Sequence, residues 1–356
     1  MLSDTSVAFL KRLLDTPGPS GFEAAPARVW AAEAGAFSTV TRDVMGNTMA
    51  AAGPEEGPVV MLAGHIDEIG FIITYIDDDG FASIAPIGGW DPQVVPGQRL
   101  RILTDEGDVF GVVGKKPVHL MKPPEREKVT PLTDVFVDVG AASRAEAESM
   151  IAVGDAAVID ARTIELPNGR IVSRSIDDRV GAFVVLEALR RYAARPGSAH
   201  LVAVATVQEE IGMHGGGALV AAGRVNPTMA VAVDVTFATD HPQIEKREVG
   251  DHRLGGGPVL TRGSIISPAV FRLLRQTATS LAIPFSVNAA GRDTSTDADF
   301  LHIARGGVPT GLVSVPNRYM HSPNEMVSLS DLDHCAELLA ELARRVDHSM
   351  DWTDRR

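Results

Sequence analysis

The chain has 356 residues, of which 45% are hydrophobic, and it carries 46 acidic against 33 basic residues, a formal net charge of −13. This length is more than a usual single domain and predicts one large domain with a smaller second one. The acidic balance and the lack of a long basic run argue against nucleic acid or an anionic membrane as partner, since both require clustered lysines and arginines.

The first predicted element is a helix at the N-terminus. Its apolar residues from Val7 to Leu14 recur at helical spacing, and Ser3 or Asp4 can cap its first turn. This segment lacks the layout of a signal peptide, and no uncharged apolar run approaches the length of a membrane span. The only cysteine, Cys335, can form no internal disulfide and is expected to be a buried core residue. We therefore expect a cytoplasmic protein.

A strand is expected at residues 58–64 (PVVMLAG). After this strand, the pattern of predicted secondary structure changes. Residues 69–163 contain short β-rich runs such as FIITYI and VFGVVG, separated by turn signals such as DDDG at 77–80. Only ASRAEAESMI resembles a helix in this stretch. The pattern predicts a compact β module inserted into an α/β domain made of residues 1–68 and 164–356.

From about residue 165, apolar strands again alternate with helices. Continuous apolar strands separated by helices are typical of a mostly parallel sheet with both faces covered. The expected strands are residues 201–207, 229–234 and 311–315, and the expected helices include residues 180–192 and residues 268–282, with Ser267 as N-cap.

Side chains able to bind a divalent cation recur where the predicted strands end. In an open α/β sheet, sites form outside the carboxyl ends of the strands, so the fold would bring such residues to one edge. Carboxylates and histidines in this combination suit zinc, cobalt or manganese. The candidates are His65 and Asp67 after the first strand, Asp177 and Asp178 at the start of a helix, Glu209 and Glu210 after residues 201–207, Asp234 at the end of residues 229–234, and His321 after residues 311–315.

Each of these residues, taken alone, has an ordinary structural explanation. A histidine after a strand is usually a hydrogen-bonded loop residue, and an Asp-Asp pair can simply cap a helix. Adjacent glutamates can form a solvated strand end. These explanations do not account for the recurrence of such groups at one end of the sheet, because clustered anions repel one another unless a cation neutralises them.

Several ordered motifs closely resemble those of the M42 family of metallo-aminopeptidases, within the dinuclear zinc exopeptidases. The resemblance extends from the PGPSGFE segment to the end of the chain. It implies the zinc-exopeptidase fold, with residues 69–163 as a β-barrel-like dimerisation domain and with dimers that build a tetrahedral dodecamer. The motifs read GHIDEIG, SIDDRVG, TVQEEIGMHGG, VDVTFATDHP, TSTDAD and RYMHSPNE.

The resemblance also implies a metal centre. Each subunit would bind two divalent ions, with zinc expected and cobalt or manganese as alternatives. Asp177 would bridge the two ions. The other ligands would be His65 and Asp234 on one ion and Glu210 and His321 on the other.

The implied activity is the removal of N-terminal residues from peptides that have a free N-terminus. A metal-bound water would be the nucleophile, and Glu209 would be the general base that takes its proton. Asp67 would orient His65 as an outer-shell carboxylate. The residues whose roles stay open are His119, His214, Asp297 and Asp299.

Other functions on this scaffold also stay open. A deacylase or amidase of N-acylated amino acids would use the same metals, whereas a glycosidase would use paired carboxylates and would not need the histidines. A non-catalytic assembly protein would keep only the fold, and the intact candidate ligands and Glu209 argue against it. A serine hydrolase is disfavoured because the sequence has no G-x-S-x-G motif.

Overall fold

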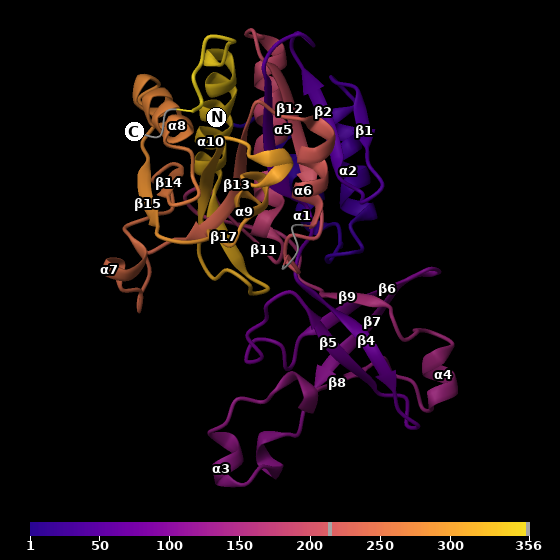
Figure 1. Ribbon diagram of the computed structural model, residues 1–356. Helices are drawn as coiled ribbons and strands as arrows, with labels where there is room; N and C mark the ends of the chain where they lie inside the picture. Colours follow the sequence, from indigo (N-terminus) through magenta and orange to yellow (C-terminus); the bar gives the residue numbers. More distant parts are fainter. Residues whose placement is uncertain (213–215, 354–356) are drawn as a thin grey trace.

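The computed structural model describes residues 1–212 and 216–353, which form a larger domain and a smaller one (Figure 1). The larger domain contains an eight-stranded sheet. The smaller domain is a closed β-barrel, inserted in the chain after β3 (Val59–His65). The first and last helices, α1 (Asp4–Asp15) and α10 (Leu329–Arg345), both lie in the larger domain. This arrangement confirms the predicted α/β fold with an inserted β domain.

The main sheet is mixed but mostly parallel. Its strand order is β1-β2-β12-β3-β13-β16-β14-β15, and the four central strands from β12 to β16 run parallel to one another. Their carboxyl ends therefore meet at one edge of the sheet. The other strands are β1 (Val40–Arg42), β2 (Thr48–Ala52), β12 (His200–Thr206), β13 (Met229–Phe237), β14 (Val259–Gly263), β15 (Ser286–Ala290) and β16 (Thr310–Asn317).

The four strands expected from apolar runs are these four central strands. Two of them are longer than predicted, because β13 continues past Asp234 to Phe237 and β16 continues past residue 315 to Asn317. The extra residues of β13 pair with β16, where Phe237 lies opposite Asn317. Asp234 is therefore inside a strand and not at its end.

Helices cover both faces of the sheet. On one face, α5 (Ile176–Ala194) packs against β3, β12 and β13, and α1 and α10 pack against α5. The residues of α5 from Ile176 to Leu189 are all buried, because the helix lies between the sheet and other helices. On the other face lie α6 (Gly216–Val225) and α9 (Ala298–Leu301). None of the described helices is long and apolar enough to cross a membrane.

The remaining helices follow the predicted capping pattern in part. Ser3 caps α1 by accepting a hydrogen bond from the Ser6 backbone N–H at 3.1 Å, and Ser267 caps α8 by accepting from the Val270 N–H at 3.5 Å. The bounds are α2 (Ala24–Ala34), α7 (Lys246–Val249) and α8 (Pro268–Ser280), and a 3-10 turn lies at Ala304–Gly306.

The start of α5 comes unusually close to β3. Gly64 faces Gly181, and a Cβ added to Gly64 would overlap the backbone of Gly181. A Cβ added to Gly181 would in turn overlap the carboxylate of Asp178. Glycine at both positions permits this approach. The contact places the first turn of α5 beside His65, the residue that follows Gly64.

The inserted domain has its own hydrophobic core, which includes Phe71, Leu100 and Val137. Its barrel order is β4-β5-β8-β7-β6-β9. The predicted helical segment contains α4 (Arg144–Glu148), but a second short helix, α3 (Pro123–Arg126), was not expected. The barrel strands are β4 (Gly70–Ile76), β5 (Ala82–Ile87), β6 (Arg99–Thr104), β7 (Gly107–Gly114), β8 (Phe136–Asp138) and β9 (Ala156–Ile159), and two 3-10 turns lie at Val118–Leu120 and Leu132–Asp134.

A small three-stranded sheet and a buried arginine complete the larger domain. The sheet order is β10 (Ile164–Leu166), β11 (Arg170–Ser173) and β17 (Glu325–Ser328). Arg179 of α5 is fully buried and pairs with Glu68 at 2.9 Å. It also donates to backbone carbonyls of the N-terminal segment, including Leu13 and Gly18. The N-terminal segment is thereby tied to the helix that begins at the candidate site.

Candidate metal centre

The predicted site residues gather at the carboxyl edge of the central strands. His65 is the last residue of β3, and Asp234 lies near the end of β13. The other residues come from loops and from a helix start: Glu209 and Glu210 follow β12, His321 lies between β16 and β17, and Asp177 lies in the first turn of α5.

Asp177 lies between the two histidines. Its Oδ1 is 3.1 Å from His65 Nε2, and its Oδ2 is 3.4 Å from His321 Nε2. The same His321 nitrogen is 3.3 Å from Glu210 Oε2. Each oxygen of Asp177 thus faces a different imidazole. Burial alone would raise the pKa of Asp177, but the contacts with His321 and His65 outweigh burial and lower it.

Two overlapping groups of side chains bring their donor atoms within 4.8 Å of one another. One is His65, Asp177 and Glu210, and the other is His65, Asp178 and Asp234. Asp178 differs from its neighbour, because its two oxygens accept hydrogen bonds from the backbone N–H groups of His65 (3.2 Å) and Gly181 (3.0 Å). Asp178 is fully buried, whereas Asp177 lines the cavity described below.

These residues fit a divalent cation. Imidazole nitrogens and carboxylate oxygens are donors that zinc and similar ions accept. Glu210 Oε1 is buried and accepts no hydrogen bond from the described part of the chain, which is costly for a carboxylate oxygen. Burial, together with repulsion from Asp177, raises the pKa of both Glu210 and Asp234. A cation at this place would supply the missing partner and the missing positive charge.

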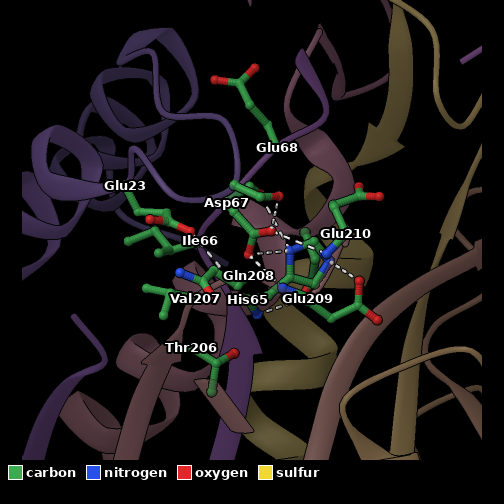
Figure 2. A network of polar contacts seen from close by, with 12 residues as sticks. Glu23, His65, Ile66, Asp67, Glu68, Thr206, Val207, Gln208, Glu209 and Glu210 are labelled. Atoms are coloured by element: carbon green, nitrogen blue, oxygen red, sulfur yellow. Dashed lines mark hydrogen bonds and ion pairs between the residues drawn. The ribbon is translucent and has the colours of Figure 1, made fainter. Parts of the chain in front are cut away.

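Asp67 joins three parts of the cluster and lies at the centre of the network in Figure 2. Its Oδ1 is 3.4 Å from His65 Nδ1 and accepts a hydrogen bond from the Glu209 backbone N–H at 3.2 Å. Its Oδ2 accepts from the Glu210 N–H at 3.1 Å and from the Ser20 hydroxyl at 2.6 Å. Burial alone would raise the pKa of Asp67, but the contacts with His65 and the other donors lower it. Asp67 is thus a charged acceptor that fixes both an imidazole and a turn.

Glu209 lies beside this cluster. Its Oε2 is 3.8 Å from His65 Nε2, and its side chain lines the cavity. Burial raises its pKa well above the usual value, the His65 charge opposes this, and Asp234 adds to it. Glu209 therefore holds a proton more readily than an exposed glutamate does.

The cluster opens on a cavity of about 640 Å³, a size in the range of small-ligand sites. Asp177, Glu209, Glu210 and Asp234 form its acidic side. The remaining wall includes the apolar side chains Val235, Phe237, Phe300 and Met320 and the polar residues Asp293, Thr294, Ser295, Thr296 and Asp299.

Asp297 and Asp299 support the surroundings of the cluster. Asp297 is buried, which raises its pKa to about 6, and its Oδ2 accepts a hydrogen bond from the Thr206 hydroxyl at 2.5 Å. Asp299 accepts from the backbone N–H groups of Thr294 (2.8 Å) and Ser295 (2.9 Å). These contacts order the end of β12 and a loop of the cavity wall.

Two further histidines were singled out by the sequence. His119 is exposed in the inserted domain, in the 3-10 turn at Val118–Leu120. It lies in the smaller domain and is not part of the cavity wall. His214 lies outside the described residues.

Glu23 and Glu325 are buried carboxylates near the cluster that were not predicted from the sequence. Glu23 Oε1 accepts a hydrogen bond from the Gln208 backbone N–H at 3.1 Å, and burial, with repulsion from Asp67, raises the pKa of Glu23 to about 7. Glu325 accepts from the backbone N–H groups of Asp177 and His321. Both lie inside quoted motifs, PGPSGFE and RYMHSPNE, and their motif membership was the only available signal.

Known proteins resemble this chain over most of its length. The family model for M42 glutamyl aminopeptidases matches residues 46–338. The lysyl aminopeptidase of Pyrococcus furiosus is 34% identical over 349 residues, which are 97% of this chain and 98% of that protein. A TET aminopeptidase from a marine sediment Thaumarchaeota archaeon has a TM-score of 0.91 at 33% identity, with 97% of both chains covered. The TET1 peptidase of Pyrococcus horikoshii, solved as a dodecamer, has a TM-score of 0.84 at 30% identity over 97% of this chain and 100% of its own.

Proposed function

Because the chain belongs to the M42 family of metallo-aminopeptidases, we propose that it removes N-terminal residues from peptides with two divalent ions and with Glu209 as general base. The observation that carries this proposal is the position of Asp177. Its two oxygens face His65 and His321, at the edge of a cavity that Glu209 also lines.

We assign His65 and Asp234 to one ion and Glu210 and His321 to the other, with Asp177 shared between them. The two-sided placement of Asp177 and the unpartnered Glu210 Oε1 support this assignment. When bound, such ions polarise the scissile carbonyl and lower the pKa of a water molecule. Zinc is the proposed metal, and cobalt and manganese accept the same donors.

Glu209 is placed to move the protons of the reaction. Its carboxylate takes a proton from the attacking water and delivers it to the leaving amine. Its raised pKa makes this carboxylate a stronger base toward the proton of the attacking water than an exposed glutamate would be. Asp67 holds the Glu209 backbone N–H and His65 Nδ1, so it orients the base and one ligand together.

Two carboxylates of the cavity wall that are not proposed ligands, Asp293 and Asp299, suit the positive α-ammonium group of a peptide. We therefore expect aminoacyl chromogenic substrates with a free N-terminus to be hydrolysed at least ~10-fold faster than their N-acetylated forms, because acetylation removes a charged donor. The measurement is kcat/KM for matched pairs of substrates. Preferential cleavage of the acetylated forms would instead indicate a deacylase, and release of a chromophore from glycosides would indicate a glycosidase.

The cavity wall also predicts a preference among N-terminal residues. No lysine or arginine of residues 1–212 and 216–353 lines the cavity. The basic group on the described wall is His321, which is a proposed metal ligand, and the wall also carries the carboxylate of Asp293. A lysyl substrate should therefore have a kcat/KM at least about fivefold above that of a glutamyl substrate, the effect of one partly exposed charge pair. Asp293→Asn should reduce this ratio, and Asp79→Asn, in an exposed turn of the inserted domain, should leave it unchanged. A faster glutamyl substrate would contradict the prediction.

We also propose that the inserted domain mediates dimers and that the dimers build a dodecamer, as in the related TET1 peptidase. A projecting arm, residues 115–134, extends from the barrel in Figure 1 and exposes the apolar side chains Val118, Leu120 and Val129. Light scattering should give the mass of a dodecamer, and Leu120→Asp should shift the population to smaller species. Val44→Asp, at an exposed apolar residue of the larger domain, is the control. Monomers at all concentrations would contradict the proposal.

A further inference from the structure

We propose that Glu325 is a positioning residue that holds Asp177 and His321 in the arrangement needed for metal binding. This inference rests on the proposed function, since both held residues are proposed ligands. It concerns a residue that neither touches the cavity nor belongs to the proposed ligand set.

The geometry is a two-pronged contact. Glu325 is the first residue of β17, and its side chain is buried with 1% of its surface exposed. Its Oε2 accepts a hydrogen bond from the Asp177 backbone N–H at 3.0 Å, and its Oε1 accepts from the His321 backbone N–H at 2.8 Å. One carboxylate therefore links the start of α5 to the loop between β16 and β17.

A carboxylate is the side chain that this place requires. Two backbone N–H groups point at it, and a carboxylate offers an acceptor to each, whereas an amide offers one acceptor and turns its own N–H₂ toward the second donor. His321 moreover has a φ of 58°, which is uncommon for a residue other than glycine. The hydrogen bond to its N–H supports that backbone conformation.

The charge of Glu325 has no structural partner in the described chain. No lysine, arginine or histidine of residues 1–212 and 216–353 forms an ion pair with it, although buried carboxylates are usually paired. Burying a carboxylate without a neighbouring cation costs free energy, even when it accepts hydrogen bonds from two segments of the chain. Metal ions bound by Asp177 and His321, the two residues that Glu325 orients, would supply the positive charge that offsets this cost.

Asp67 makes a similar pair of contacts elsewhere in the cluster. It accepts the backbone N–H groups of Glu209 and Glu210 and contacts His65. The two carboxylates thus hold different proposed site residues. Asp67 fixes the backbone of Glu209 and Glu210, and Glu325 fixes the backbone of Asp177 and His321.

The test compares Glu325→Gln with a matched control, Asp331→Asn. Asp331 of α10 is also a buried carboxylate that accepts two backbone N–H groups, from Gly255 (2.7 Å) and Gly257 (2.8 Å), but it lies away from the cavity wall. Zinc is titrated into the metal-free full-length proteins in competition with a chromophoric chelator. Glu325→Gln should weaken zinc binding by ~10–100-fold at one of the two sites, and Asp331→Asn should bind both ions as the wild type does. Thermal unfolding of the metal-free forms measures the purely structural cost of each change.

The outcomes separate the two proposals. Wild-type binding of two ions, together with unchanged binding by a folded Glu325→Gln variant, would overturn the role of Glu325 and leave the proposed function intact. If the wild type binds no zinc, both proposals fall. Should Glu325→Gln fail to fold, Glu325→Asp decides: it keeps the charge but is too short to reach both N–H groups, so it should show the same loss, and tight binding of both ions by it would overturn the role.

Discussion

Removal of bound metal should reduce peptide hydrolysis to the background rate, and addition of zinc, cobalt or manganese should restore it. The physical reason is that residues 1–212 and 216–353 place no other electrophile at the cluster: the described wall of the cavity contributes carboxylates, hydroxyls, apolar groups and one histidine. Without an ion the acidic side would repel the developing negative charge of the reaction.

The measurement pairs activity with metal analysis. A chelator-treated and dialysed sample should contain no ion and show no activity, and the restored sample should contain two ions per chain. Metal should also raise the unfolding temperature, because an ion that binds only the folded state stabilises it. Full activity in a sample shown to be free of metal would contradict the proposed function.

Substitution of Glu209 by glutamine should lower kcat by at least ~10²-fold while both ions stay bound. The amide keeps the shape of the side chain but cannot accept the proton of the attacking water. Glu209 is not a proposed ligand, and its backbone N–H contact with Asp67 is unaffected by the change. The measurement is kcat together with the number of ions bound per chain.

Glu210→Gln is the matched comparison, because it makes the same chemical change at the adjacent residue. Its Oε2 lies 3.3 Å from His321 Nε2, within the proposed ligand set, so this variant should lose affinity for one ion and recover part of its activity in excess metal. Asp67→Asn should fall between the two, with a loss of ~10–100-fold. Loss of metal from Glu209→Gln, with both ions kept by Glu210→Gln, would reverse the assignment of base and ligand.

The fold was predictable where burial leaves a simple pattern. The four central parallel strands are covered on both faces and appear in the sequence as continuous apolar runs. The short strand β9 (Ala156–Ile159) and the helix α3 (Pro123–Arg126) were missed because each has only four residues, too few to show a period. β13 was predicted too short because Thr236 and Phe237 are more exposed than the rest of the strand.

The candidate site was predictable only in part. Its acidic and histidine residues could be found because they follow strands and lie within family motifs. The contacts that orient them could not be found in this way, because they join backbone N–H groups to side chains far away in the chain. Glu325 reaches Asp177, and Glu23 reaches Gln208, across segments whose proximity depends on the folded sheet. The pairing of Arg179 with Glu68 has the same origin.

The wide separation of the site residues along the chain has a kinetic consequence. Ser20 and Glu325 both belong to the cluster's hydrogen-bond network, and the whole inserted barrel, from Gly70 to Ile159, intervenes between them. Contacts between residues so distant in sequence require the closure of long loops and form slowly, whereas the barrel strands pair within a shorter segment around their own core. During refolding, we therefore expect the barrel to become protected first and the ability to capture metal to emerge last, so that a nascent chain would acquire activity only when synthesis has passed the strand that carries Glu325.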